Sequence, residues 1–258
     1  MKINFIFKLL ISSIILLQAP VIGKEYTFVS LSPALTEVMY AIGAQNSLQA
    51  VSTTCSYPAE VKEKDVIGDT IFINEEKILL IKPDYILAPD SSGFAIEKFR
   101  RMGITPISFK NPNIKSIEEN IISLGKMTGK EENAQLLVNK IEAEIKKANL
   151  HHNKKILYLI QTTPMISIGN KSFITDIIEK SGNISITKKL NYFYPVISEE
   201  FAISEKPDVI ILSYWTDEKR IKKLFPYAKI IYMTEEENDI VNRPGPRIYE
   251  SVKFFAQF

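Results

Sequence analysis

The sequence has few of the side chains that carry covalent, redox or metal chemistry. Cys55 is the only cysteine, so no disulfide can form within the chain, and packing as a small side chain is its simplest role. The only histidines, His151 and His152, stand together. We interpret them as solvated linker residues, with metal binding as the alternative. The chain also contains no serine-nucleophile elbow, HExxH pair, phosphate-binding glycine loop or CxxC pair.

These absences exclude the constellations that catalysis needs, namely a nucleophile with an oriented base or a set of metal ligands. We therefore predict that the protein is not an enzyme and holds no cofactor or metal of its own. A secreted enzyme acting on a cofactor-like substrate is the alternative from another class.

A strong charge of one sign is also lacking. The chain has 32 basic and 30 acidic residues. Removal of residues 1–23 would delete two lysines and no acid, which leaves 30 residues of each sign. A nucleic-acid surface needs a basic excess, so we expect no nucleic-acid partner.

Residues 1–23 have the layout of a secretory signal peptide. Lys2 and Lys8 precede an apolar run from Leu9 to Leu17, and Gly23 offers a small residue for cleavage. No other segment approaches the roughly 18–20 apolar residues that a membrane span needs. No cysteine stands near the cleavage point, so we expect a periplasmic protein that is not a lipoprotein. A retained membrane anchor is the alternative.

One pattern of residues occurs twice. Residues 75–87 read EEKILLIKPDYIL, and residues 199–211 read EEFAISEKPDVII. In each copy a short helix is predicted to begin after Asn74 or Ser198 as N-cap. The proline of the Lys-Pro-Asp sequence ends this helix and leads into a short, buried strand.

The repetition extends upstream of both copies. Residues 36–43 read TEVMYAIG and residues 175–182 read TDIIEKSG, each predicting a helix that ends at a glycine. Each follows a strand-like run, at 27–31 and at 155–160. The sequence therefore predicts two similar α/β lobes with mostly parallel sheets.

A long helix is predicted between the lobes. We place the N-terminal lobe at 24–127, the interlobe helix at 128–150 and the C-terminal lobe at 151–258. Thr128 and Glu131 have the spacing of a capping box. An apolar stripe follows at Leu137, Ile141 and Ile145. One stiff helix of about 30 Å should let the lobes open and close little.

Several short motifs follow one another along the whole chain after the signal peptide. They are SLSPALTEVMYAIG at 30–43, TTCSYP at 53–58, IGD at 67–69, LIKPDYILA at 80–88, LGKMTGKEENA at 124–134, SFITDIIEKSG at 172–182, YPVISEE at 194–200, KPDVII at 206–211 and RPGPRI at 243–248. With them the chain resembles the periplasmic substrate-binding proteins of ABC importers that have a helical backbone and carry cobalamin, haem or iron–siderophore complexes. The resemblance implies a chelate ligand between the lobes of a monomer. It also implies an ABC permease dimer with its ATPase as partner in the inner membrane.

Within that family the chain looks most like the cobalamin-binding group. The stretch 194–200 resembles the aromatic-proline element of that group, Tyr57 falls where it carries Tyr-Pro, and Asp239 matches an acid that contacts the ligand's polar rim. Thr70 and Pro89 depart from the group, which has tryptophan at both positions. The resemblance therefore favours cobalamin or another corrinoid, and leaves another chelate open.

The walls of the cleft are expected to come from loops that follow strands. The predicted ligand-binding residues are Pro33, Tyr57, Phe72, Met165, Tyr192, Tyr194, Trp215, Asp239 and Arg243, mostly aromatic or otherwise apolar as a macrocycle requires. The resemblance implies an acidic knob on each lobe for docking to the permease, at Glu76 and Glu200. Stabilisation of the helix dipole is the alternative role of these acids.

Three other interpretations of the function remain open. Haem would need an axial tyrosine or histidine, and Tyr57 and Tyr192 could serve. A ferric siderophore would favour arginines in the cleft, for which Arg243 and Arg247 are the candidates. A secreted binding module without a transporter, such as a sensor or scavenger, is the third.

Overall fold

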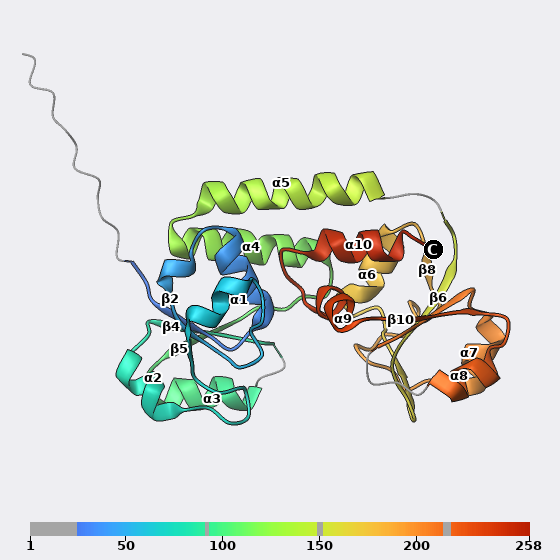
Figure 1. Ribbon diagram of the computed structural model, residues 1–258, viewed down its shortest axis with the longest axis horizontal. Helices are drawn as coiled ribbons and strands as arrows, with labels where there is room; N and C mark the ends of the chain where they lie inside the picture. The colour runs from blue at the N-terminus through green and yellow to red at the C-terminus, as the bar shows by residue number, and fades with distance from the viewer. Residues whose placement is uncertain (1–24, 91–92, 149–151, 214–217) are drawn as a thin grey trace, which may run out of the picture.

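The computed structural model describes residues 25–90, 93–148, 152–213 and 218–258, and it contains two β-sheets that lie side by side with helices around them (Figure 1). The first sheet lies in the N-terminal half of the chain and the second in the C-terminal half. This is the two-lobed α/β architecture that the sequence predicts.

The first sheet has five parallel strands in the order β3-β2-β1-β4-β5. The strands are β1 (Phe28–Ser30), β2 (Leu48–Val51), β3 (Asp65–Val66), β4 (Tyr85–Ala88) and β5 (Thr105–Ser108). The helices of this half are α1 (Pro33–Ala41), α2 (Glu75–Ile81) and α3 (Gly93–Arg101), with short 3-10 helices η1 (Gln45–Ser47) and η2 (Ala59–Glu63). Because the strands are parallel, the loops that follow them gather at one edge of the sheet.

The second sheet has the order β10-β9-β6-β7, and β8 also pairs with β6. The strands are β6 (Lys155–Thr162), β7 (Met165–Ser167), β8 (Ile184–Ser185), β9 (Val209–Leu212) and β10 (Lys229–Tyr232). Only the pairing of β7 with β6 is antiparallel among these strands. The helices of this half are α6 (Phe173–Lys180), α7 (Glu199–Glu205), α8 (Glu218–Leu224), α9 (Glu235–Asn242) and α10 (Ile248–Phe255).

The Lys-Pro-Asp sequence has the same structural role in both halves. Lys82 and Lys206 end α2 and α7 in the left-handed conformation, with φ of 49° and 51°. The following aspartate then caps the first strand of its own half: Asp84 accepts from the backbone N–H of Thr27 at 2.9 Å. Asp208 accepts in the same way from Lys155 at 2.8 Å. The strands that follow, β4 and β9, pair in parallel with β1 and β6, so the predicted duplication of architecture is confirmed.

Helix α5 (Glu131–Ala148) connects the two halves and matches the helix expected there. A second helix, α4 (Ile114–Thr128), packs against it in the opposite direction (Figure 1). The capping box expected at Thr128 and Glu131 is wrong, because Thr128 is the last residue of α4 and its hydroxyl donates to the Leu124 carbonyl at 2.7 Å. Gly129 ends α4 with φ of 65°, a conformation that favours glycine.

The largest buried cluster extends across both halves. It contains Phe28 of β1, Ile121 of α4, Ile141 of α5, Tyr158 of β6 and Val252 of α10. A smaller buried cluster covers the other face of each sheet. The two halves therefore share one core beneath the helices α4, α5 and α10, and burial of this core holds them together. Over the ranges that the structure describes, no helix is long and apolar enough to cross a membrane.

Candidate functional site

A cavity of about 600 Å³ lies between the two halves. The first half contributes the loops after β1, β4 and β5, at the carboxyl edge of its sheet. The second half contributes the loop between β7 and α6, the aromatic pair Phe193–Tyr194 and the segment after α9. The lining residues are Ser32, Pro33, Ala34, Leu35, Ala88, Pro89, Asp90, Phe109, Asn111, Lys171, Ser172, Phe173, Phe193, Tyr194, Asn242, Arg243 and Pro244. We call this space the cleft cavity.

A network of small polar side chains shapes the loop after β1. Ser32 is the N-cap of α1 and accepts from the Leu35 N–H at 3.4 Å, and Pro33 takes the first helical position. The Thr36 hydroxyl donates to the Ser30 hydroxyl at 2.8 Å and lies 3.2 Å from the Cys55 sulfur. Cys55 is buried and free. This packing presents Pro33 to the cavity on a fixed backbone.

In the second half, Gly169 positions the aromatic segment. Its N–H donates to the Phe193 carbonyl at 3.0 Å. A Cβ at this position would lie 2.2 Å from the Tyr192 carbonyl oxygen and 2.6 Å from that of Leu190, so only glycine permits the close approach. Ser167 N–H also donates to the Pro195 carbonyl at 3.0 Å. These backbone bonds hold residues 192–195 against the loop that follows β7.

A cluster of charged residues joins the halves beside the cleft cavity. Glu37 of α1 is 2% exposed. It accepts from Arg243 Nη1 at 2.9 Å, and from Arg247 Nε and Nη2 at 2.9 Å each. Arg243 also donates from Nη2 to Asp239 at 2.6 Å and to the Ser56 hydroxyl at 3.0 Å. Both guanidinium groups are therefore already paired with carboxylates of the protein.

The pKa shifts near the cavity have physical causes in this packing. Burial lowers the pKa of Arg247, but the hydrogen bonds and the charge of Glu37 outweigh it, so the pKa of Arg247 is raised overall. Burial raises the pKa of Tyr194 above its ordinary value, so its phenol stays neutral. Burial also raises the pKa of Tyr158, whose hydroxyl donates to the Asn242 side chain at 3.0 Å and fixes that lining residue.

Three of the predicted ligand-binding residues line the cleft cavity, namely Pro33, Tyr194 and Arg243. Met165 does not, because it lies in β7 at 4% exposed and packs in the core of the second half. Trp215 lies outside the residues that the structure describes.

The other four predicted residues lie elsewhere. Tyr192 is next to the lining but is 66% exposed. Phe72 is 79% exposed in the loop before α2 and does not reach the cavity. Asp239 forms an ion pair with Arg243 at 2.6 Å and is not among the residues that line the cavity, and its role at a ligand's rim stays a prediction. Tyr57 lies beneath Arg247, whose guanidinium carbon is 4.1 Å from the centre of the ring.

Several lining residues were missed by the sequence reasoning. Phe109 directly follows β5 and would have been found by the rule that cleft walls follow parallel strands. Lys171 and Phe173 flank Ser172, the N-cap of α6, which corresponds to Ser32 in the first half. Asn242 could not be found in this way. The sequence of α9 predicts a capped helix, but it does not predict what the last turn of this helix lies against.

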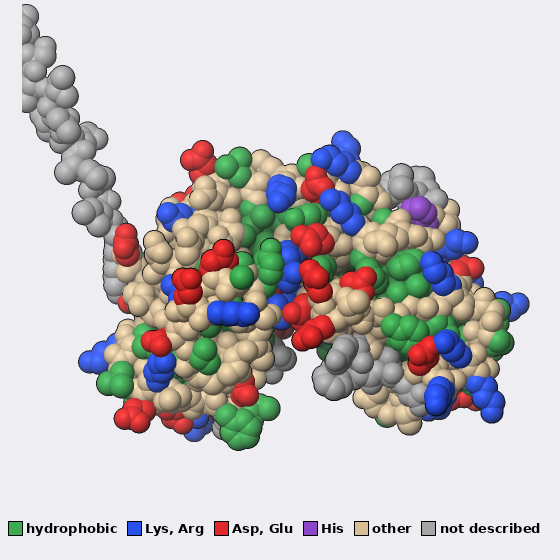
Figure 2. Space-filling model, in the orientation of Figure 1, with side chains coloured by type: hydrophobic (Ala, Val, Ile, Leu, Met, Phe, Trp, Pro, Cys, Tyr) green, Lys and Arg blue, Asp and Glu red, His purple; other side chains and the backbone are tan. Residues whose placement is uncertain are grey.

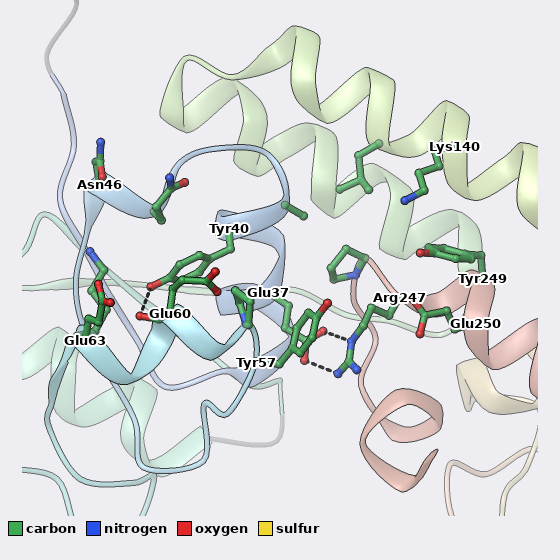
Figure 3. A pocket seen from close by; sticks show the side chains of 16 residues that line it. Glu37, Tyr40, Asn46, Tyr57, Glu60, Glu63, Lys140, Arg247, Tyr249 and Glu250 are labelled. Carbon is green, nitrogen blue, oxygen red and sulfur yellow. Dashed lines mark hydrogen bonds and ion pairs between the residues drawn. The ribbon is translucent and has the colours of Figure 1, made fainter. Parts of the chain in front are cut away.

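Tyr57 lines a second cavity of about 720 Å³ instead (Figure 3). This cavity lies between α1, η2, α5 and the start of α10, and we call it the seam cavity. Arg247 and Glu37 line it as well. Figure 2 shows charged side chains of both signs gathered where the two halves meet on this face. Across the described ranges, no group of three or more His, Cys, Asp or Glu side chains could hold a metal ion.

The two predicted docking acids occupy equivalent positions. In the first half, Glu75 pairs with Lys98 of α3 at 2.6 Å. In the second half, Glu199 pairs with Arg220 of α8. The next residue in each helix, Glu76 or Glu200, has no ion pair with any described residue. Each half therefore presents one exposed carboxylate without an ion pair among the described residues at the start of α2 or α7. Hydrogen bonds from its own backbone N–H and from Ser198 lower the pKa of Glu200.

Residues 28–225 match the family of periplasmic binding proteins. The ABC transporter substrate-binding lipoprotein YvrC of Bacillus subtilis, itself uncharacterised, is 26% identical over 250 residues, which cover 89% of this chain and 78% of that protein. A vitamin B12-binding protein of Vibrio vulnificus is 27% identical over 256 residues, covering 93% of this chain and 90% of that protein.

Solved structures of the same family have the same fold. The periplasmic vitamin B12 binding protein of Vibrio cholerae superposes with a TM-score of 0.75 at 23% identity, covering 90% of this chain and 95% of that one. The periplasmic haem binding protein of Vibrio cholerae superposes with a TM-score of 0.76 at 20% identity, covering 91% and 98%. These relatives are solute-binding proteins and not enzymes, which confirms the expectation of a non-enzyme. The chain belongs to the periplasmic binding protein family, the solute-binding proteins of ABC importers.

Proposed function

We propose that the protein binds cobalamin or another corrinoid in the cleft cavity and delivers it to an ABC permease. The proposal includes export through a cleaved signal peptide at 1–23, a periplasmic location without a lipid anchor, and a monomeric state. The name of the Vibrio vulnificus relative supports the ligand class.

The observation that carries the proposal is the character of the cleft cavity. Its walls include four aromatic side chains, namely Phe109, Phe173, Phe193 and Tyr194. Its one arginine, Arg243, is already neutralised by Glu37 and Asp239. Of the charged residues in the described lining, Asp90 and Lys171 remain, one of each sign. A large, flat chelate with a small net charge suits such walls, because aromatic contact supplies the affinity and a few polar groups set the orientation.

The same observation argues against an anionic ferric siderophore. Such a ligand needs free cationic donors, and an arginine taken from Glu37 would leave a buried carboxylate without its partner. The predicted role of Arg243 and Arg247 as siderophore ligands is therefore disfavoured.

Haem is the second candidate. The phenol of Tyr194 lines the cleft cavity, and tyrosine is one of the side chains that can hold haem iron. The haem-binding structure from Vibrio cholerae shares the fold only. Haem also carries propionates, for which Lys171 is the available cation in the described lining.

Docking to the permease is assigned to Glu76 and Glu200. Dipole stabilisation applies to every acid in the first turn of these helices. Neighbouring helices neutralise Glu75 and Glu199 while leaving the next acid exposed, and they do so in both halves. A two-fold symmetric permease with matching basic sites is the partner that such a pair of acids fits.

The test is a calorimetric titration of the purified protein. The ligands are cyanocobalamin, hemin, a neutral ferric hydroxamate and an anionic ferric catecholate. We expect saturable binding of cyanocobalamin with one site per chain, and weaker or no binding of the other three. Tighter binding of hemin, with an absorption spectrum typical of tyrosine ligation, would establish the second candidate instead.

A further inference from the structure

The loop that precedes α2 exposes two large apolar side chains. Ile71 and Phe72 are 78% and 79% exposed, and they line neither the cleft cavity nor the seam cavity. Contact with water is unfavourable for side chains of this size, and grouped apolar side chains at a surface indicate an interaction site. The ligand site does not use this pair, so the pair requires an account of its own.

Hydrogen bonds within the loop fix its backbone. The Asp69 carboxylate accepts from the N–H groups of Ile71 and Phe72 at 2.7 Å each. The N–H of Asp69 donates to the Phe72 carbonyl at 3.1 Å, and Gly68 and Ile73 form an antiparallel bridge. The loop is therefore a built turn that keeps both apolar side chains in water. Because the turn is ordered in advance, a partner that covers these side chains spends little free energy on ordering them.

The second half has an exposed apolar residue at the equivalent position. Phe72 stands two residues before the N-cap of α2, and Val196 stands two residues before the N-cap of α7. Val196 is 67% exposed, and its backbone forms an antiparallel bridge with Ile166 of β7. A fixed, exposed apolar side chain thus precedes α2 and α7 alike.

An exposed acid accompanies the apolar residue in both halves. Glu76 and Glu200 each stand four positions after it, in the first turn of α2 or α7. One helical turn beyond Glu76, on the same face of α2, lies Leu80, which is 76% exposed. The corresponding residue of α7 is Ser204. The first half therefore exposes more apolar surface around its acid than the second half does.

The place and the composition of these surfaces favour one class of partner. Helices α2 and α7 lie in the lower part of their halves, away from α5 (Figure 1), and hydrophobic side chains reach the surface at the lower end of the first half (Figure 2). An anionic lipid surface would repel both acids, and two copies of this chain that met through these surfaces would bring like charges together. A membrane protein with two equivalent subunits can meet both surfaces at once.

We propose that the ABC permease docks on the apolar side chains that accompany the two acids. We call this set the docking surface: Phe72, Glu76 and Leu80 of the first half, with Val196 and Glu200 of the second. The inference rests on the docking role assigned to the acids under the proposed function and adds a second kind of contact. Apolar burial supplies affinity and excludes water from beside the acids, while the acids set the orientation. The first half is then the stronger anchor.

Photo-cross-linking identifies the partner. The purified protein carries p-benzoylphenylalanine at position 72, 80 or 196 and is added to spheroplasts of the source organism, and the adducts are identified by mass spectrometry. The matched control is position 136, because Leu136 is 60% exposed on α5, away from α2 and α7 (Figure 1). We expect adducts with an ABC permease subunit from the first three positions and none from the control.

Binding of the fluorescently labelled protein to the same spheroplasts tests the contribution of each half. Phe72→Ser with Leu80→Ser should weaken binding by roughly tenfold. The loss should be the same at low and at high salt, because apolar contacts are not screened. Val196→Ser should weaken binding by less, and the control Leu136→Ser should leave it unchanged. Circular dichroism of each variant verifies the fold.

Adducts with lipid or with a second copy of this chain would overturn the proposal, and so would equal adducts from position 136 or unchanged binding of the first double variant. None of the substituted residues lines the cleft cavity, so titration with cyanocobalamin should give the affinity of the unaltered protein. A weaker affinity in these variants would also overturn the proposal. Permease adducts from a protein that does not bind cyanocobalamin would instead reject the proposed ligand and leave the docking surface standing.

Discussion

The carboxylate of Glu37 accepts two hydrogen bonds of 2.9 Å from Arg247, which lies 210 positions further along the chain. The first residue belongs to α1 and the second precedes α10, so this bidentate pair ties the N-terminal half to the C-terminal end of the fold. Arg243 binds the same carboxylate and also lines the cleft cavity. One buried acid thus fixes a wall of each cavity.

Glu37→Gln should therefore destabilise the protein strongly. It leaves Arg247, whose side chain is 11% exposed, without its carboxylate, and leaves Arg243, 15% exposed, with Asp239 alone. Removing one partner of a buried ion pair costs about 3–5 kcal/mol, which urea unfolding would measure. The control Glu97→Gln breaks only exposed pairs with Arg100 and Arg101, for which less than about 1 kcal/mol is expected. Equal effects of the two changes would show that the Glu37 pair does not hold the halves together.

The docking acids can be tested by reversing their charge. Glu76→Lys together with Glu200→Lys should leave corrinoid affinity unchanged, because neither residue lines the cleft cavity. Association with the permease and uptake should fall by roughly tenfold or more, with a smaller effect of each single change and a dependence on salt. The control Glu131→Lys with Glu132→Lys reverses two acids at the start of another helix, α5. Normal uptake by the first double variant at physiological salt would reduce these acids to helix-dipole stabilisers.

A comparison of neighbouring tyrosines tests the cleft wall. Tyr194→Ala should weaken corrinoid binding by roughly 1–4 kcal/mol if the ring acts as an aromatic anchor. Tyr192→Ala removes a ring of the same size, two residues away and outside the lining, and should change affinity by far less. Calorimetry with cyanocobalamin measures both. If Tyr192→Ala were the more damaging change, the ligand would lie against a different face of this segment.

Local features of the sequence predicted the repeated unit well. Asn74 and Ser198 cap α2 and α7 as expected, because a cap depends on residues close in sequence. The partners of Glu37 could not be predicted in this way, since no local pattern links α1 to Arg243 and Arg247. The motif 243–248 indicated the family, but not that both arginines pair with carboxylates of the protein itself.

Burial explains why two other residues that were predicted to line the cleft do not do so. Met165 was assigned to the cleft because it follows β6 closely, but β7 turns back on β6 and carries the side chain into the core. Phe72 was assigned by the same rule, yet its ring is exposed and does not line the cavity. A strand-end rule locates an edge of the sheet, while the fold of each loop decides which side chains reach the cavity.

The pKa of Tyr249 offers a test of the seam cavity. Burial, with the hydrogen bond and charge of Glu250, raises the pKa of Tyr249 to about 12. Because the folded pKa lies above the ordinary value of about 10, the stabilisation from this residue is complete below pH 10 and is lost as pH rises towards 12. The ultraviolet difference titration between the unaltered protein and Tyr249→Phe should give this midpoint, and Glu250→Gln should lower it. A midpoint near 10 in both the unaltered protein and the Glu250→Gln variant would mean that the Tyr249 phenol is open to water.

The central claim is that a corrinoid occupies the cleft cavity between the two halves. Amide hydrogen exchange of the protein with and without cyanocobalamin tests it most directly. The account predicts slower exchange in the segments 32–35, 88–90, 171–173 and 193–194, which line the cleft cavity, and no change around 57–64, at the seam cavity. Protection that is confined to residues 57–64 and 246–250, or no protection at saturating cyanocobalamin, would contradict the account.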